Sequence, residues 1–168
     1  MSSDILGSRG ASERDEARAT DDDLKLAGFF VGHGMYGIEI MRIKEVIQAA
    51  PHPVRPVPLA PDIVEGVIQL RGVVIPVVDL RRRFGTEARE ELKRLNKLII
   101  VSVGGRIAGL KVDKVIGELR VSPNAVRPAP SMLRPPVSGD ATEDMFSGVC
   151  RVGEDMVFLL NLEALLRV

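Results

Sequence analysis

The stretch from Gly66 to Gly85, with the sequence GVIQLRGVVIPVVDLRRRFG, constrains the fold of this chain more than any other. It contains two apolar runs, Val67–Leu70 and Val73–Val78, separated by Arg71-Gly72. Runs of about 4–8 β-branched residues between turn residues are typical of buried strands. Glycine permits a turn or bulge that a residue with a Cβ resists. The stretch therefore predicts two buried strands with a turn or bulge between them.

A short helix is predicted directly after the second run. The carboxylate of Asp79 can cap the first turn of Leu80–Phe84, because aspartate is among the preferred residues at a helix N-terminus. Gly85 fits just past the helix end, where a left-handed backbone is common. Strand, cap, helix and glycine thus follow one another without a break.

The composition favours many short strands over long helices. The 168 residues are 45% hydrophobic but only 4% aromatic, and they include 16 glycines and 11 prolines. Glycine and proline together exceed their usual share of roughly 12%, which is typical of short strands joined by turns. The length fits one domain or two small interlocked ones, at about 100–200 residues per domain.

Further apolar runs separated by turn residues predict more strands. With the two above they make about nine, which favours a barrel or sandwich over alternating strands and helices. The segment Met41–Gln48 fits either one face of a helix or a strand. The other runs are Leu26–Val31, Tyr36–Ile40, Lys97–Val103, Arg106–Val112, Val115–Val121, Phe146–Val152 and Met156–Leu160.

Two segments lack the pattern of a packed core. Residues 1–24 are charged and poor in large apolar side chains, so we expect a disordered N-terminal tail. Ser122–Asp144 contains five prolines and is predicted to form a long loop. Near the end of the sequence, Asn161 can cap a short closing helix, Leu162–Leu166. The folded domain is expected to span residues 25–168.

Charge and polarity argue against functions in nucleic-acid binding or within a membrane. The net charge is zero and the pI is about 6.8, whereas nucleic-acid-binding domains typically have a pI above about 9. No apolar run approaches the roughly 18 residues that cross a membrane, and the N-terminus lacks a secretory signal. The one cysteine, Cys150, suits a reducing compartment, and we expect it to be a small buried hydrophobe. We therefore predict a cytoplasmic protein without direct membrane insertion.

No motif predicts catalysis, a metal or a cofactor. Gly32–Gly37 has the spacing G-x-G-x-x-G, but Ile38–Ile40 alternates like a strand instead of opening the helix that a dinucleotide site requires. We interpret it as a hairpin turn. Histidine and cysteine lack zinc-ligand spacing, and paired carboxylates such as Glu90-Glu91 lie in charged, loop-like sequence. The prediction is therefore no catalytic residue, no metal site and no cofactor.

Two charged residues stand out because of their neighbours. Glu39 lies between Ile38 and Ile40, so strand alternation turns it away from the core. Arg71 follows the first apolar run and precedes Gly72. From the sequence alone, both can be ordinary exposed charges or parts of a binding surface.

Several short motifs, taken in order, resemble those of the CheW-like bacterial chemotaxis coupling proteins. Each is weak alone, but their joint order and spacing are specific, and they cover residues 25–168. This chain departs from the common pattern in its charged tail, its proline-rich loop and its short final helix. The matching motifs are Tyr36–Ile40, Lys44–Ile47, Gly66–Gly85, Gly109–Val115, Gly148-Val149 and Leu160–Leu166.

The resemblance implies an all-β (mainly β) fold of two interlocked five-stranded SH3-like β-barrels, with a groove between them and a short C-terminal helix. It implies a non-enzymatic adaptor that couples the cytoplasmic tip of chemoreceptors to the regulatory domain of the CheA histidine kinase, a domain that is itself CheW-like. By motif match, Glu39 and Arg71 fall in the receptor-facing region, and we predict that they form an ion pair there.

A second hypothesis is a small β-barrel that binds single-stranded nucleic acid. Such a protein needs stacking aromatic side chains along a positively charged groove. One tyrosine, five phenylalanines and zero net charge argue against it.

Overall fold

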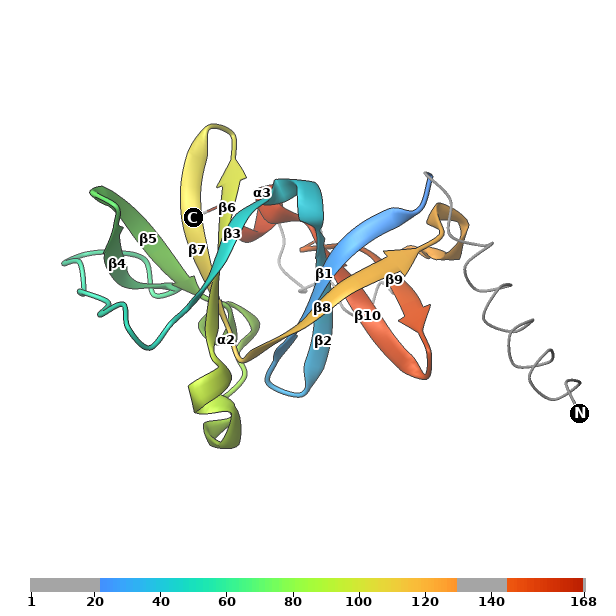
Figure 1. The fold of residues 1–168 in the computed structure, drawn as a ribbon, viewed down its shortest axis with the longest axis horizontal. Coiled ribbons are helices and arrows are strands. Elements are labelled where there is room, and N and C mark those ends of the chain that lie inside the picture. The colour runs from blue at the N-terminus through green and yellow to red at the C-terminus, as the bar shows by residue number, and fades with distance from the viewer. Residues whose placement is uncertain (1–21, 130–144, 168) are drawn as a thin grey trace, which may run out of the picture.

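The computed structural model describes residues 22–129 and 145–167, and these are mainly β-structure. Ten strands form two five-stranded sheets that lie side by side along the long axis of the molecule (Figure 1). The first sheet has the order β8-β1-β2-β10-β9, and the second has the order β3-β6-β7-β5-β4. The strands are β1 Leu24–Val31, β2 Gly34–Glu39, β3 Ile43–Gln48, β4 Val64–Leu70, β5 Val73–Asp79, β6 Lys97–Val103, β7 Arg106–Val112, β8 Lys114–Val121, β9 Phe146–Val152 and β10 Asp155–Leu160.

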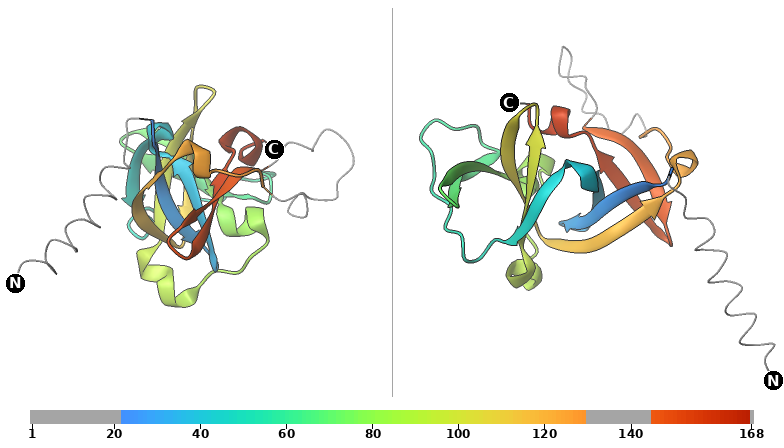
Figure 2. Two further views of the ribbon diagram at one scale, coloured as in Figure 1. Left: turned by 90° about the vertical axis from the view of Figure 1, so that its right-hand side faces the viewer. Right: turned by 45° about the horizontal axis from the view of Figure 1, so that its top comes forward.

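The two sheets are interlocked because the chain leaves the first and later returns to it. Strands β1 and β2 belong to the first sheet, β3 to β7 build the second, and β8 to β10 complete the first. The chain leaves through the 3-10 turn η1, Ile40–Arg42, and returns through one residue, Asp113, between β7 and β8. Figure 2 shows the same two sheets from two further sides.

The strands are arranged alike in both sheets, although the chain passes through them in a different order. In each, a hairpin (β1–β2 or β6–β7) is flanked on one side by a parallel strand, β10 or β5, and on the other by an antiparallel strand, β8 or β3. In each sheet, the segment after one edge strand also bridges the strand at the opposite edge, through Arg55–Val67 and Arg127–Val149. These bridges require glycine beside them, since a Cβ at Gly66 would collide with the Arg55 carbonyl.

The signature stretch folds largely as its residues predict. The backbone turns at Arg71 and Gly72, both with positive φ of 51° and 80°, which join β4 to β5. The Asp79 side chain caps α2, Leu80–Phe84, by accepting from the backbone N–H of Arg81 at 3.0 Å, and Gly85 ends the helix with φ of 68°. The two strands, the cap and the helix are confirmed, whereas the predicted burial of the strands holds only in part.

The remaining elements settle whether Met41–Gln48 is a helix or a strand, and they include the short closing helix. Met41–Gln48 contains the end of η1 and then β3, so a tenth strand joins the nine expected. Asn161 caps α3, Leu162–Leu165, and two further 3-10 turns are η2, Glu90–Leu95, and η3, Pro123–Ala125. Of the expected tail, residues 1–24, only the last three are among the described residues. Residues 130–144 of the proline-rich loop also lie outside the described residues.

The largest core cluster is shared by the two sheets. It contains Phe29 and Ile38 from the first sheet and Ile99, Val101 and Leu110 from the second, all nearly inaccessible to solvent. Each sheet also has a smaller core cluster, formed mainly by its own residues. Because the main cluster belongs to neither half alone, packing contributes to the joint between them.

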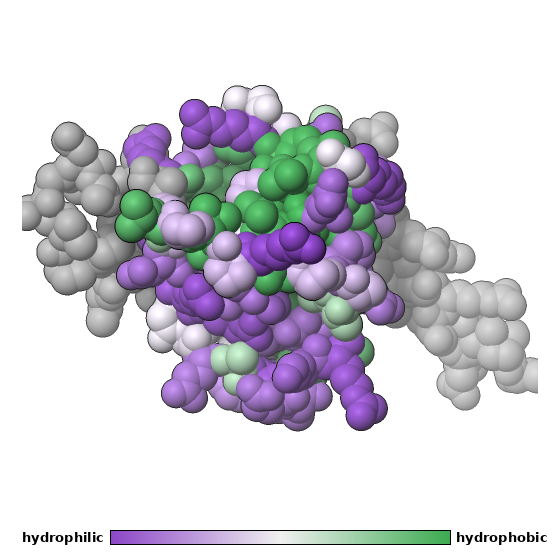
Figure 3. All heavy atoms as spheres, turned by 90° about the vertical axis from the view of Figure 1, so that its left-hand side faces the viewer, coloured by the Kyte–Doolittle hydropathy of each residue, from purple (hydrophilic) through white to green (hydrophobic). Residues whose placement is uncertain are grey.

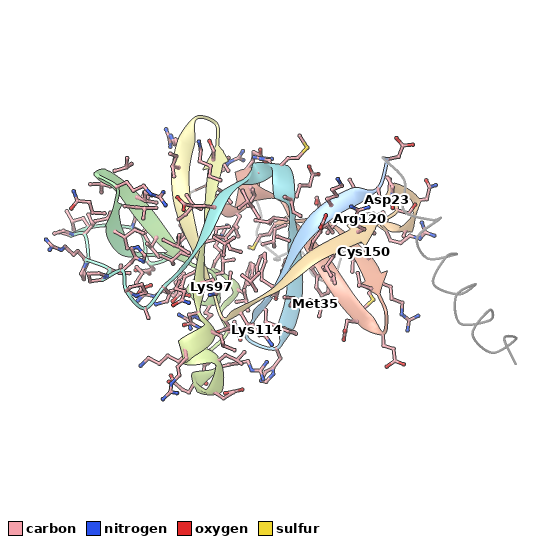
Figure 4. The ribbon with its side chains drawn as sticks, viewed as in Figure 1. Asp23, Met35, Lys97, Lys114, Arg120 and Cys150 are labelled. Atoms are coloured by element: carbon pink, nitrogen blue, oxygen red, sulfur yellow. The ribbon has the colours of Figure 1, made fainter. Side chains whose placement is uncertain are left out.

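Cys150 lies in the cluster of the first sheet, with Leu26, Val157 and Leu159. Figure 4 shows it in the half of the molecule that also contains Met35. Burial raises the pKa of the Cys150 thiol, which disfavours the reactive thiolate. The prediction of a small buried hydrophobe is confirmed.

A buried ionic cluster lies where the chain returns to the first sheet. Asp113 is fully buried, and its Oδ2 accepts from the backbone N–H of Gly32, in the β1–β2 turn, at 2.6 Å. Its Oδ1 accepts from Nη1 of Arg81, on α2, at 3.2 Å. The Nε of Arg81 also donates to Asp79 Oδ1 at 2.9 Å. One arginine thus connects the end of β5 to the crossing between the sheets.

Two opposing effects act on the Arg81 guanidinium. Burial acts to lower its pKa, but the hydrogen bonds and charges of Asp79 and then Asp113 outweigh burial and raise it. Arg81 therefore stays protonated, and the cluster keeps its charges paired.

We expect Arg81→Met to destabilise the fold strongly. The substitution leaves Asp113 buried without its charged partner, and breaking a buried pair in this way costs about 3–5 kcal/mol. Urea unfolding followed by circular dichroism measures the loss. As a control, Arg120→Met removes an exposed pair with Glu118 (3.7 Å), which is worth at most about 1 kcal/mol. Equal unfolding midpoints for the two variants would contradict a stabilising role for the cluster.

Candidate functional site

The described residues present surfaces for protein contact more clearly than a chemical centre. Within residues 22–129 and 145–167, no group of three His, Cys, Asp or Glu side chains is placed to hold a metal. No helix in this part of the chain is long and apolar enough to cross a membrane. Five of the six aromatic side chains pack against one another at the joint and in the first sheet: Phe29, Tyr36, Phe84, Phe146 and Phe158. Because these rings pack on one another, they do not form a line of free aromatic faces on which nucleic-acid bases could stack.

A groove separates α3 from the second sheet and is called here the α3 groove. Its cavity volume is about 580 Å³. Although α3 follows β10 of the first sheet, it lies beside the β6–β7 hairpin of the second (Figures 1 and 2). The floor is apolar, with Ile63, Val64, Pro76, Val78 and Ala108, and the rim carries Arg106, Glu163 and Arg167. An apolar floor with a charged rim suits an amphipathic segment of a partner.

Glu39 lies beside α3, on another side of the helix. It is exposed, as strand alternation predicts, and it lines a second hollow of about 300 Å³ together with Arg42, Asn161 and Glu163. Arg42 Nη2 donates to Glu163 Oε1 at 2.6 Å. That hydrogen bond, and then one from the backbone, lowers the pKa of Glu163. Because Glu163 borders both hollows, Glu39 lies close to the α3 groove.

Arg71 lies elsewhere, at the turn between β4 and β5. Its Nη1 donates to Glu45 Oε1 at 2.5 Å and its Nη2 to Glu45 Oε2 at 3.0 Å, which is a bidentate pair. The hydrogen bond lowers the pKa of Glu45 and raises that of Arg71. Arg71 remains largely exposed in this pair.

The predicted ion pair between Glu39 and Arg71 is therefore wrong. Glu39 ends β2 in the first sheet, whereas Arg71 and its partner Glu45 belong to the second. The error has a physical cause, because motif spacing indicates which residues face outward but not which sheet receives each strand. Glu45 comes only a few residues after Glu39, and the chain changes sheets between them.

The β4–β5 hairpin carries a group of exposed apolar side chains, called here the apolar hairpin surface. Val73 and Val74 are 49% and 63% exposed on β5, and Val57 and Leu59 of the preceding connection are also exposed. Figure 3 shows apolar side chains gathered over part of this end of the molecule, beside hydrophilic ones. Exposed apolar side chains are ordinary when single, but a group of them indicates a contact surface.

This exposure corrects the sequence prediction that Val73–Val78 is a buried strand throughout. Strand β5 pairs with β7 only from Val77 to Asp79, so its first half is paired with β4 alone. Because the run is apolar throughout, its sequence does not indicate where β5 changes from exposed residues to buried ones. The available signal was Pro76, because proline in a strand favours an edge position.

Known proteins support one family for this chain. A model of the CheW-like domain family matches residues 25–168. The chain is 32% identical over 148 residues to "Chemotaxis protein CheW" of Treponema pallidum, covering 86% of this chain and 83% of that protein. It is 33% identical over 145 residues to the protein of that name from Rhizobium meliloti, covering 86% and 88%.

A solved structure agrees with these matches. The scaffolding protein TtCheW from Thermoanaerobacter tengcongensis superposes with a TM-score of 0.74 at 30% identity, covering 90% of this chain and 92% of that one. A crystal structure of a related scaffold therefore has a similar fold over nearly the whole chain. By family model, sequence identity and fold together, the chain belongs to the CheW-like family of chemotaxis coupling proteins.

Proposed function

We propose that this coupling protein is a non-enzymatic cytoplasmic adaptor that contacts the cytoplasmic tip of chemoreceptors with one surface and the regulatory domain of the CheA kinase with another. The observation that carries the proposal is the separation of two surfaces of different chemistry. The α3 groove, between α3 and the second sheet, has an apolar floor and a charged rim. The apolar hairpin surface lies on the β4–β5 hairpin of the second sheet. An adaptor needs two such surfaces so that both partners bind at once.

The apolar hairpin surface is proposed as the kinase contact. Docking one β-domain on another buries apolar strand surface, and the core of a protein interface is depleted of charge. Val73 and Val74 supply that surface, and Val67 and Gln69 line a shallow hollow beside Val74. A contact of this kind depends little on salt, because salt screens charges and not apolar burial.

The α3 groove is proposed as the receptor contact. A helical segment that lays its apolar face in the groove would meet charges along its flanks at Arg106, Glu163 and Arg167. Glu39 is proposed as a receptor contact because it lies beside α3. Arg71 is kept as a second proposed receptor contact from the family motif, at a position close to the exposed valines.

Two further features of the fold belong to this proposal. We propose that each sheet is an SH3-like barrel, and the bridges Arg55–Val67 and Arg127–Val149 between opposite edges support that curvature. We also propose that residues 1–24 are a tail outside a domain of residues 25–168, which is the range of the family match.

We expect Val74→Glu to abolish co-elution of the chain with its cognate kinase in size-exclusion chromatography, because the change places a charge in the apolar contact. The wild-type complex should persist at high salt. Ile116→Glu is the matched control, since Ile116 is an exposed apolar residue of β8 in the first sheet. Failure of the wild type to co-elute, or equal loss in both variants, would contradict the kinase contact at this hairpin.

We expect Glu39→Arg and Arg71→Glu to weaken sedimentation of the chain with receptor-containing membranes while kinase co-elution is retained. Both side chains are exposed, so the urea midpoint should change little. Exchanging the partners, Glu45→Arg with Arg71→Glu, restores the local ion pair but inverts its charge pattern, and should not restore receptor binding. If Arg71→Glu loses the kinase and keeps the receptor, Arg71 belongs to the kinase contact and its receptor assignment is wrong.

A further inference from the structure

One wall of the α3 groove depends on a helix that is too short to be stable alone. Helix α3 has four residues, whereas isolated helices shorter than about 12–15 residues are marginal in water. Its last carbonyl groups need hydrogen-bond partners from outside the helix. Yet Glu163, Leu166 and Arg167, in and after this helix, form the groove wall.

Arg83 of α2 supplies a partner for the Leu165 carbonyl and a further one for the Ala164 carbonyl, which also accepts from the backbone N–H of Arg167 at 3.4 Å. Its Nε donates to the Leu165 carbonyl at 3.2 Å, and its Nη2 lies 3.5 Å from the Ala164 carbonyl. The guanidinium is partly buried and brings a positive charge to the helix C-terminus, where the helix dipole favours it. Arg83 follows β5 of the second sheet and α3 follows β10 of the first, so this contact joins the two halves at the C-terminal end of α3.

The helix that carries Arg83 is held in place by the residues on either side of it. Two residues earlier on α2, Arg81 is held by Asp79 and Asp113. The next residue, Phe84, stacks on Tyr36 of the first sheet with ring centroids 4.7 Å apart. The Arg42–Glu163 pair also holds α3, but its side chains are 34% and 54% exposed, and a pair this accessible to solvent contributes little.

We propose that Arg83 is a positioning residue for receptor binding, which holds α3 in place as a preformed wall of the α3 groove. This inference rests on the proposed function, because it takes that groove to be the receptor contact. A wall that is already ordered spares the partner the entropy of ordering it, and preorganisation of this kind raises affinity. Arg83 need not touch the receptor to have this effect.

Three variants test the proposal. Arg83→Ala removes both bonds. Arg83→Lys keeps the charge but not the planar fork that reaches two carbonyls. Arg94→Ala is the control, since it removes an exposed arginine of η2 that lies away from α3. Each is measured by hydrogen exchange of the Leu165 and Leu166 amides, by affinity for a soluble fragment of the receptor tip, and by kinase co-elution.

We expect Arg83→Ala to speed exchange of both amides and to weaken receptor affinity about tenfold, as for lost hydrogen bonds to a charged group. Arg83→Lys should recover part of this affinity. Kinase co-elution should be unchanged in all variants, and Arg94→Ala should match the wild type in every measurement.

Three results would overturn the inference. If the wild type binds the receptor fragment and Arg83→Ala binds it equally well, Arg83 does not position the groove, and the proposed function stands. If Arg83→Ala and Arg83→Lys lose receptor and kinase together with a large fall in the urea midpoint, Arg83 acts on general stability. If the wild type binds no receptor fragment, the proposed function fails and this inference fails with it.

Discussion

The joint between the two sheets depends on the hydrogen bonds that one buried carboxylate accepts from both sides. Asp113 is the single residue between β7 and β8, and both of its oxygens accept hydrogen bonds, one from Gly32 and one from Arg81. A buried charge without partners is costly, so the carboxylate is stable only when the β1–β2 turn and α2 both reach it. The crossing point therefore specifies how the first sheet lies against the second.

Helix α2 extends this joint to α3, which forms one wall of the α3 groove. Leu80 is buried in the shared core, Arg81 reaches the crossing, Arg83 reaches α3, and Phe84 stacks on Tyr36. Four of its five side chains thus contact different parts of the molecule. A protein that holds two partners in a defined geometry needs such a rigid connection, because relative motion of its halves would change the spacing between the groove and the hairpin.

Local features of the sequence predicted local structure well. The Asp79 cap, the turn at Arg71-Gly72 and the burial of Cys150 each follow from residues adjacent in the chain, and all are confirmed. Contacts between side chains far apart in the sequence could not be predicted from local features. The partner of Arg71 is Glu45, because the change of sheets after Glu39 is invisible to motif spacing. The roles of Arg83 and Asp113 depend likewise on contacts between elements far apart in sequence.

The interlocked connectivity also has a consequence for the order in which the halves can assemble. All five strands of the second sheet lie within residues 43–112, so that sheet is complete in the chain before β8 is reached. The first sheet holds β1 and β2 at one end of the sequence and β8, β9 and β10 at the other. Contacts between such distant segments form slowly. During synthesis, the hairpin that exposes Val74 can therefore exist before α3 is present to wall the groove.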